Sequence, residues 1–451
     1  MSEKRSSFTG KIGFVLAAAG SAVGLGNIWR FPYLAAKYGG GIFLLVYLVL
    51  AVTLGFALMS AEVAIGRKTG QSAIGAFRML NKKYTFIGWL ASVVPMIILP
   101  YYCVIGGWVI KYFTVFIIGG VERAATDGYF ENFIGGAWEP IGWFFLYLAF
   151  TALIVLFGVE KGIEKVSKFM MPLLVLMTVG IAVYIMFLPG AMDGVKYYLL
   201  PDFSKFSVNT VLSAMGQLFY SMSIAMGIMI TYGSYMKKDI RLESSVRQIE
   251  SFDTAIAFLA GLMVIPAVFS FSGGDEATLG KGPGLMFVTL PKVFDSITGG
   301  SVIGSVFFLL VFFAALTSSI SLMETIVSIL QDKLGWGRRR ACLVVFGGCL
   351  LLGLPSTLGF GVLGDFTIAG LTFLDMFDFL SNSVLMPIVA LLTCLFVGYV
   401  IKPKTLIEEM QVGGAFKSQR LFTVIIKYVA PVCIVLILIS SVLDGLGIVK
   451  L

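Results

Sequence analysis

Long apolar runs separated by short polar segments dominate the sequence. A helix that crosses a membrane needs about 20 mostly apolar residues, and about eleven segments meet that requirement. They are residues 11–37, 41–66, 86–117, 141–158, 168–189, 208–235, 248–272, 300–331, 340–354, 367–400 and 421–446. Several are longer than one straight crossing needs, so we expect them to tilt or break. The pattern predicts an all-α membrane protein with about 11 transmembrane helices.

Small and polar residues interrupt two of these runs at mid-membrane depth. Gly20–Asn27 interrupts the first run, and Tyr220–Gly227 interrupts the sixth. The first interruption alone is also typical of close helix packing, because Gly20 and Gly24 form a small-xxx-small pair. The pair of interruptions is more informative, since paired breaks in corresponding segments indicate the binding site of a transporter.

The two interrupted runs correspond if the chain contains a 5+5 inverted repeat. We expect a single transmembrane domain over residues 1–451, with a first repeat at about 11–189 and a second at about 208–400. An extra helix at about 421–446 would follow. Unwound helices 1 and 6 free backbone N–H groups, which attract a carboxylate, and carbonyl oxygens, which bind a cation. Such backbone is stable only around a cavity or inside protein, so a cavity at the membrane midplane is expected.

The composition agrees with a lipid environment. Hydrophobic residues make up 58% of the chain and charged residues 13%, far from the roughly 25% charged of a soluble domain. The formal charge is +8, and most of the 33 basic residues fall in loops on one side of the predicted spans. The positive-inside rule makes that side cytoplasmic, which places the N-terminus inside and the C-terminus outside a bacterial inner membrane. This bias accounts for the basic character, so no nucleic-acid partner is needed.

Common catalytic chemistry is disfavoured. The chain has no His, which removes the commonest general base and metal ligand. Its five cysteines lie in apolar runs and read as small buried side chains. No complete dinucleotide or phosphate-loop motif is present, so an enzyme is not expected.

Three acidic residues lie inside apolar runs. Such residues cost about 2.5–3.5 kcal/mol each to insert into a membrane. Glu62 and Glu324 are expected to be hydrogen-bonded to neighbouring helices. Asp253 is expected to balance a bound cation, because the chain offers no His and no intramembrane Lys to pair with it. A hard cation such as Na⁺ prefers oxygen ligands, which Asn27, Ser221, Asp253, Thr317 and Ser318 supply.

Five separated motifs resemble the neurotransmitter:sodium symporter family. They are AGSAVGLGNIWRFPY within Gly13–Gly41, GQLFYSMS at Gly216–Ser223, ITYGSY at Ile230–Tyr235, FFAALTSSIS at Phe312–Ser321 and DMFDFLSN at Asp375–Asn382. They occur in the family's order and spacing across nearly the whole chain. The resemblance is to bacterial amino-acid transporters of the eleven-helix type.

The resemblance implies two Na⁺ sites. The first would use the Ala22 carbonyl, Asn27, Ser221 and Asp253. Many relatives have Asn where this chain has Asp253, and a carboxylate there implies chloride independence. The second site would be formed by the carbonyl oxygens of Gly20, Val23 and Ala314 and the hydroxyls of Thr317 and Ser318.

The resemblance also implies an α-amino acid as substrate. Monoamine carriers have an Asp at the position of Gly24, whereas Gly leaves room for a substrate carboxylate, and Tyr102 matches the Tyr that holds it. The expected substrate-binding residues are Ser21, Ala22, Gly24, Leu25, Gly26, Ile98, Tyr102, Tyr220, Ser221, Ser223, Met226, Ser318 and Leu322. Met226 replaces a Phe of some relatives and favours a hydrophobic or aromatic ligand.

The expected gates follow the same resemblance. Arg30 and Asp378 would form the outer gate above Tyr220, and Arg5 and Asp332, supported by Tyr235, would close the cytoplasmic side. The implied function is sodium-coupled import of an amino acid by alternating access. Two alternatives remain: a proton-coupled amino-acid permease of the same architecture, and a membrane amino-acid sensor that does not transport.

Overall fold

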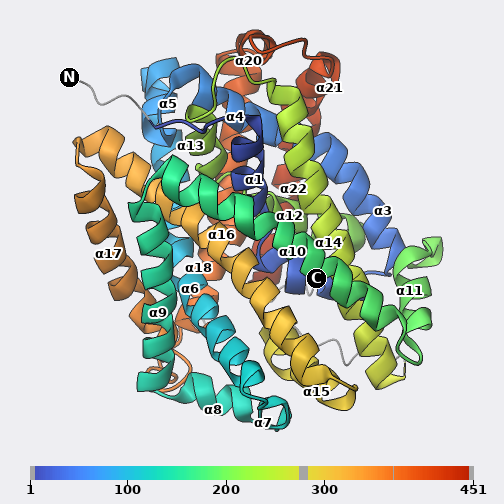
Figure 1. Ribbon diagram of the computed structural model, residues 1–451. Helices are drawn as coiled ribbons and strands as arrows, with labels where there is room; N and C mark the ends of the chain where they lie inside the picture. The colour runs from blue at the N-terminus through green and yellow to red at the C-terminus, as the bar shows by residue number, and fades with distance from the viewer. Residues whose placement is uncertain (1–5, 274–282, 369, 446–451) are drawn as a thin grey trace.

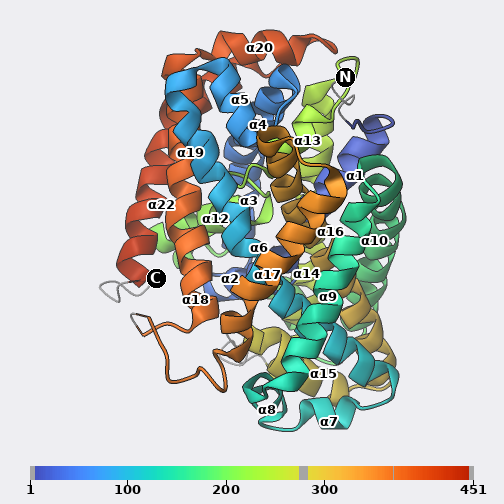
Figure 2. The same cartoon turned by 90° about the vertical axis from the view of Figure 1, so that its left-hand side faces the viewer.

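The computed structural model describes residues 6–273, 283–368 and 370–445. Within these ranges the chain is helical, with two isolated bridges and no β-strand. The long helices run between the two ends of the molecule, and short helices cover both ends (Figures 1 and 2). The all-α expectation is confirmed.

Nine spans in the described ranges are long and apolar enough to cross a membrane individually. They comprise α3–η2–α4 (Gly41–Leu50, Ala51–Gly55, Phe56–Thr69), η3–α6 (Lys82–Tyr84, Thr85–Ile117), α9 (Trp138–Leu156), η4–α10 (Val159–Glu164, Lys165–Met186), α14 (Leu242–Ser272), α16 (Gly300–Leu334), α17 (Arg338–Leu358), α18–η8–α19–η9 (Phe373–Asp378, Phe379–Leu385, Met386–Leu395, Phe396–Val400) and α21–η10–α22 (Gln419–Val424, Ile425–Val429, Ala430–Gly445). Each overlaps one of the expected apolar runs.

The first and sixth runs form broken helices, as expected. α1 (Lys11–Ala22) is followed by η1 (Gly26–Arg30) and α2 (Phe31–Lys37), and the two halves are bent by 54°. The sixth run consists of α12 (Val208–Ser221) and α13 (Ile228–Ser234), each too short to cross a membrane alone.

Short helices connect the spans. They are α5 (Ala73–Leu80), α7 (Val121–Ala125), α8 (Tyr129–Gly135), α11 (Ala191–Leu199), η5 (Phe203–Lys205), η7 (Leu285–Thr289), α15 (Leu290–Ser296) and α20 (Pro403–Gln411). α5 and α20 lie at the same end as α13, and α7, α8 and α15 lie at the other end (Figure 1). We call the end with α5, α13 and α20 the basic end, because Lys237 and Lys238 lie there, three and four residues after α13 ends at Ser234.

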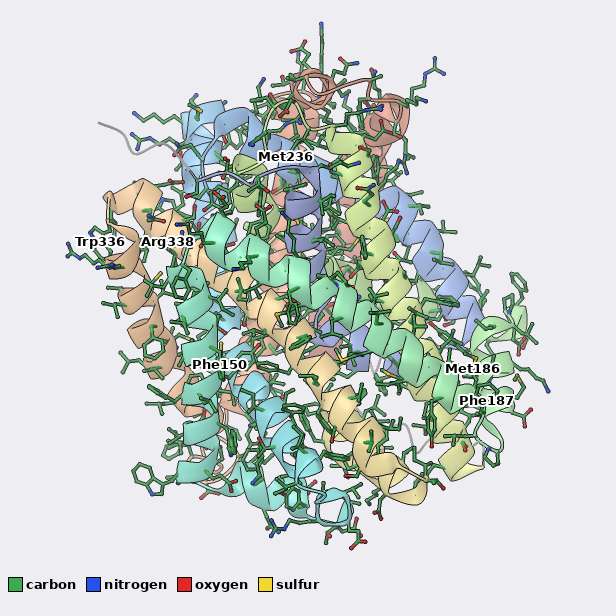
Figure 3. All side chains as sticks on the ribbon, in the orientation of Figure 1. Phe150, Met186, Phe187, Met236, Trp336 and Arg338 are labelled. Atoms are coloured by element: carbon green, nitrogen blue, oxygen red, sulfur yellow. The ribbon has the colours of Figure 1, made fainter. Side chains whose placement is uncertain are left out.

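The degree of burial separates inner from outer helices. In the most apolar stretch of α6, 83% of residues are buried, and in that of α16, 78%, whereas the corresponding values are 33% for α9 and for the last span. α16 packs most extensively against α6. On the outside, Phe150 is 41% and Phe187 84% exposed (Figure 3). Apolar side chains exposed on outer helices fit a surface that contacts lipid.

Candidate functional site

The break between α12 and α13 is built from strained backbone. Ser223 and Ala225 have φ values of 52° and 65°, a left-handed conformation that is uncommon for residues other than Gly, and Gly227 follows with φ 71°. Hydrogen bonds hold this segment. The Ser223 hydroxyl donates to the Ser21 carbonyl oxygen at 2.9 Å, and the Ala225 N–H donates to Glu62 Oε1 at 2.7 Å. The two breaks are therefore tied to each other and to α4.

A small cavity lies between the two breaks. Its volume is about 30 Å³. The structure places all thirteen sequence-predicted substrate residues around it and adds Ile228; the lining is Ser21, Ala22, Gly24, Leu25, Gly26, Ile98, Tyr102, Tyr220, Ser221, Ser223, Met226, Ile228, Ser318 and Leu322. Residues from the first break, α6, the second break and α16 thus converge on one point. We call it the binding cavity.

One end of the binding cavity is polar and tightly packed. A Cβ atom at position 24 would lie 2.7 Å from Ser318 Oγ and 3.0 Å from Tyr102 Oη, so only Gly fits there without a shift. The Leu25 N–H donates to the Tyr102 hydroxyl at 3.3 Å. A Tyr hydroxyl and the N–H groups of a half-helix beginning here are the donors that a carboxylate needs.

Asp253 lies at the centre of a buried network. Its Oδ1 accepts hydrogen bonds from Asn27 Nδ2 at 2.7 Å and from the Ser221 hydroxyl at 2.7 Å. Its Oδ2 accepts a hydrogen bond from the Tyr47 hydroxyl at 3.2 Å, and the Asp253 side chain is fully buried. We call Asn27, Ser221 and Asp253, with the expected ligand Ala22, the first cation cluster. No basic side chain among the described residues pairs with this carboxylate, and a bound cation would neutralise it.

A second group of oxygens surrounds the Ser318 hydroxyl. Ser318 Oγ lies 3.1 Å from the carbonyl oxygen of Ser21, 3.2 Å from that of Ala314 and 3.4 Å from those of Gly20 and Val23. Thr317 Oγ1 lies 3.1 Å from the Ala314 carbonyl oxygen.

One hydroxyl hydrogen can serve only one of these acceptors at a time, and each carbonyl oxygen has two lone pairs, so the oxygens here keep acceptor capacity. An excess of converging oxygen atoms is the environment that a hard cation prefers. Gly20, Val23, Ala314, Thr317 and Ser318 form the second cation cluster.

The expected outer gate surrounds a larger cavity at the end opposite the basic end. This vestibule has a volume of about 460 Å³, and Arg30, Tyr101, Tyr220 and Asp378 line it. Arg30 lies over the Tyr220 ring, with its guanidinium carbon 5.1 Å from the ring centre. Tyr220 also lines the binding cavity and therefore separates the two spaces.

Arg30 and Asp378 face the same vestibule without touching. Asp378 Oδ1 accepts hydrogen bonds from the Tyr101 hydroxyl at 3.1 Å and from Asn382 Nδ2 at 2.6 Å. Among the described residues the two charged groups form no ion pair within 4.0 Å. The neutral donors Tyr101, on α6, and Asn382, one turn after Asp378, therefore hold the Asp378 carboxylate away from Arg30.

Two of the residues expected at the other gate, Asp332 and Tyr235, lie at the basic end. Arg5 is outside the described residues. Asp332 Oδ2 accepts a hydrogen bond from the Ser72 N–H at 2.8 Å. The Tyr235 hydroxyl donates to Glu324 Oε1 at 2.7 Å, and Arg338 forms an ion pair with the same carboxylate. Glu62 and Glu324 are thus hydrogen-bonded to neighbouring elements, as expected.

Two residues of the site escaped sequence reasoning. Ile228 lies directly after the second break, as the first residue of α13. Its position directly after the interruption Tyr220–Gly227 could have indicated it. Tyr47, on α3, is 206 positions from Asp253 in the sequence. Only the three-dimensional packing of α3 against the broken helices brings its hydroxyl to the carboxylate.

The fold and the site define a class of membrane protein. Two broken helices meet around a central cavity with two oxygen-rich clusters, which is the arrangement of secondary transporters that couple an ion to a solute. The sequence profile described as the sodium:neurotransmitter symporter family matches residues 5–119 and 138–446. The chain belongs to this family and is a sodium-dependent, multi-pass membrane transporter.

Individual transporters are also similar to this chain in sequence or structure. YhdH of Bacillus subtilis, described as an uncharacterised sodium-dependent transporter, is 35% identical, and the match covers 98% of this chain and 99% of YhdH. A sodium-dependent transporter of Methanocaldococcus jannaschii is 36% identical over 86% of this chain and 80% of its own. The crystal structure of MhsT in complex with L-phenylalanine has a TM-score of 0.88 and 38% identity, covering 97% of this chain and all of that one.

Proposed function

We propose that this transporter is a sodium-coupled symporter that imports a hydrophobic or aromatic α-amino acid by alternating access, without a need for chloride. The observation that carries the proposal is the position of the first break. Ala22–Asn27 contributes both to the polar end of the binding cavity and to the first cation cluster. A substrate carboxylate placed there would lie beside the cation.

The two ends of the binding cavity support an amino acid of this type. Gly24 and Tyr102 offer the polar end. Ile98, Met226 and Leu322 line the cavity with apolar atoms. Met is flexible and can repack around ligands of different shape, which would let a small cavity enlarge for an aromatic side chain. The crystal structure of the relative MhsT is a complex with L-phenylalanine.

Two sodium ions would bind per cycle, one in each cation cluster. The first cluster supplies one carboxylate and neutral oxygens, and the second supplies neutral oxygens only. No group of three or more acidic, Cys or His residues that could hold a metal occurs in the described ranges. This donor set suits a monovalent cation, because divalent cations such as Ca²⁺ recruit several carboxylates.

Asp253 supports the proposed independence from chloride. A bound anion would place a second negative charge next to a fully buried carboxylate that already has three hydrogen-bond donors. Like charges at short distance in a low-dielectric interior repel strongly. The carboxylate would take the place of an anion.

The gates would open in turn. Arg30 would move from Tyr220 toward Asp378 to close the vestibule, and Arg5 with Asp332, supported by Tyr235, would open at the other end. We place the basic end in the cytoplasm by the positive-inside rule. The two breaks would each lie in the first helix of a repeat, and the repeats would span about 11–189 and 208–400.

Uptake into proteoliposomes tests the proposal. An inward sodium gradient is expected to drive accumulation of labelled L-phenylalanine, and replacing chloride by gluconate should leave the rate unchanged. Tryptophan should compete far better than tryptamine, which lacks the carboxylate. Liposomes without protein and a potassium gradient serve as controls.

Each of these measurements can contradict one part of the proposal. Uptake driven by a proton gradient without sodium would point to a permease, and binding without accumulation would point to a sensor. Strict dependence on chloride would contradict the role of Asp253, and equal competition by tryptamine would contradict the carboxylate site.

A further inference from the structure

Ile228 lines the binding cavity but has no role in the steps proposed above. It is the first residue of α13, and its side chain is 1% exposed. Gly227 precedes it with φ 71°, so the chain enters α13 through a left-handed conformation that favours Gly. The position of the Ile228 side chain therefore depends on the shape of the second break.

The neighbours of Gly227 place this part of the wall on the side of the binding cavity that faces the basic end. A Cβ atom at position 227 would lie 3.4 Å from Ala73 Cβ, 3.4 Å from the Ala91 carbonyl oxygen and 3.7 Å from Thr325 Cγ2. Ala73 begins α5, which lies at the basic end (Figure 1). Ile228 follows Gly227 directly, so it comes from the same side.

The two long helices of the site agree with this placement. α6 runs away from the basic end, and Ala91 precedes the lining residue Ile98 by about two turns. α16 runs toward the basic end, and Thr325 follows the lining residue Leu322 by about one turn. Both neighbours of Gly227 thus lie nearer the basic end than the lining residues of their own helices.

Ile228 and Tyr220 therefore close the binding cavity on different sides. Tyr220 separates the cavity from the vestibule, which lies at the end opposite the basic end. Ile228 closes the cavity toward the basic end. We call the Ile228 side chain the floor of the binding cavity.

The backbone that carries the floor is held firmly, because α13 and α4 are in close contact. A Cβ atom at position 66 would lie 1.8 Å from the Ile230 carbonyl oxygen, and one at position 233 would lie 2.4 Å from that of Val63. Gly at both positions lets the two helices approach this closely. Ile228 is also β-branched, which restricts the rotation of its side chain. The floor is therefore stiff.

A stiff floor matters because the binding cavity is small. Its volume of about 30 Å³ holds little more than a water molecule, so a substrate side chain must displace atoms of the wall. Met226 can yield, because its side chain is unbranched and flexible. Ile228 cannot yield in the same way. A side chain that extends from the polar end toward the basic end is therefore stopped at the floor.

We propose that Ile228 determines the largest side chain that the transporter accepts. This inference rests on the proposed function, because it takes the carboxylate of an amino acid to be held at the polar end of the binding cavity. Each further carbon atom directed toward the basic end must fit against Ile228. The residue thus sets a difference in affinity between larger and smaller amino acids.

Isothermal titration calorimetry of the purified full-length protein in saturating sodium tests the proposal with leucine, phenylalanine and tryptophan. The measured quantity is the ratio of the affinity for tryptophan to that for leucine. Ile228→Ala shortens the floor by several carbon atoms and should raise this ratio at least about tenfold, since one methylene group in an apolar pocket already has an effect of that size. Ile228→Phe enlarges the floor and should lower the ratio by a similar factor.

Ile230→Ala is the matched control. Ile230 is on the same helix, is also 1% exposed and is not among the described residues that line the binding cavity. The substitution removes the same atoms as Ile228→Ala and should leave the ratio unchanged. Ile228→Val removes only a methyl group and puts little stress on folding, and it should shift the ratio in the same direction as Ile228→Ala.

The proposal is overturned if the three variants of Ile228 keep the ratio of the unaltered protein, or if Ile230→Ala shifts the ratio as much as Ile228→Ala does. An unaltered protein that binds none of the three amino acids in sodium would contradict the proposed function and this inference with it. Normal binding with unchanged ratios in the variants would contradict the role of Ile228 alone.

Discussion

Single oxygen atoms lie at the centre of the two proposed cation clusters. The Ser318 hydroxyl is near four carbonyl oxygens, two of them from α1 and one from Val23 directly after it, and the Asp253 side chain accepts three hydrogen bonds from three different helices. Neither arrangement follows from local sequence preferences. Each depends on a residue type at one position, and each can be tested there.

Replacing Thr317 and Ser318 together by Ala should abolish activation by sodium in the physiological range. Two ligand oxygens of the second cation cluster are lost, and hydrogen-bond-like contacts to a charge are worth about 1.5–3 kcal/mol each, so sodium affinity should fall at least about 100-fold. The measurement is substrate binding as a function of sodium concentration.

Ser305→Ala is the matched control for this change, because Ser305 is on the same helix and its hydroxyl donates only locally, to Ser301. Unchanged sodium dependence in Thr317→Ala with Ser318→Ala would refute the second cluster.

The sequence predicts individual site residues well where they lie in a continuous motif. All the sequence-predicted lining residues of the binding cavity surround it, because the motifs of α1, α12 and α16 hold most of them in or next to short segments, and α6 adds Ile98 and Tyr102. Tyr47 could not be predicted, since it reaches Asp253 only through the packing of a separate helix. The separation of Arg30 and Asp378 could not be predicted either. Tyr101 and Asn382 donate hydrogen bonds to the Asp378 carboxylate, and only the folded structure brings Tyr101 to it.

At the scale of elements, polar residues predict the helix breaks, and hydropathy misses the π-helical turns. Small and hydroxyl residues interrupt α1 and α12 where the apolar pattern stops. By contrast η2, η8, η9 and η10 lie inside apolar spans. A π-helical turn changes the number of residues per turn without changing their polarity, so a hydropathy pattern cannot reveal it.

Glu62 on α4 stabilises the break between α12 and α13 by accepting a hydrogen bond from the Ala225 N–H. Glu62→Ala would leave the Ala225 N–H without its acceptor beside two residues with positive φ. We expect a loss of about 1–3 kcal/mol in stability, the cost of a buried unpaired donor. Thermal unfolding of the purified protein measures it.

Glu62→Gln keeps an acceptor oxygen and should restore most of the stability, whereas Glu160→Ala, at an exposed position, should have no effect. A Glu62→Ala protein as stable as the unaltered one would show that the break holds its shape without this hydrogen bond.

At the scale of the whole molecule, the arrangement of charge predicts its direction in the membrane. Introduced cysteines can test this, because four of the five native cysteines are buried and the fifth is half-buried. In intact cells, a membrane-impermeant maleimide should label Glu122→Cys on α7. It should label Lys404→Cys on α20 only after the membrane is opened. Both positions are exposed. The reverse pattern would invert the proposed topology.

Ser318 belongs at once to the wall of the binding cavity and to the second cation cluster. A ligand that shifts this hydroxyl alters the oxygen atoms around the ion, and an ion that draws the hydroxyl alters the wall around the ligand. Thermodynamic linkage then requires the effect to be reciprocal: whatever factor sodium adds to substrate affinity, substrate must add to sodium affinity. Through this one side-chain oxygen, sodium binding and substrate binding would each change the affinity for the other before either gate moves.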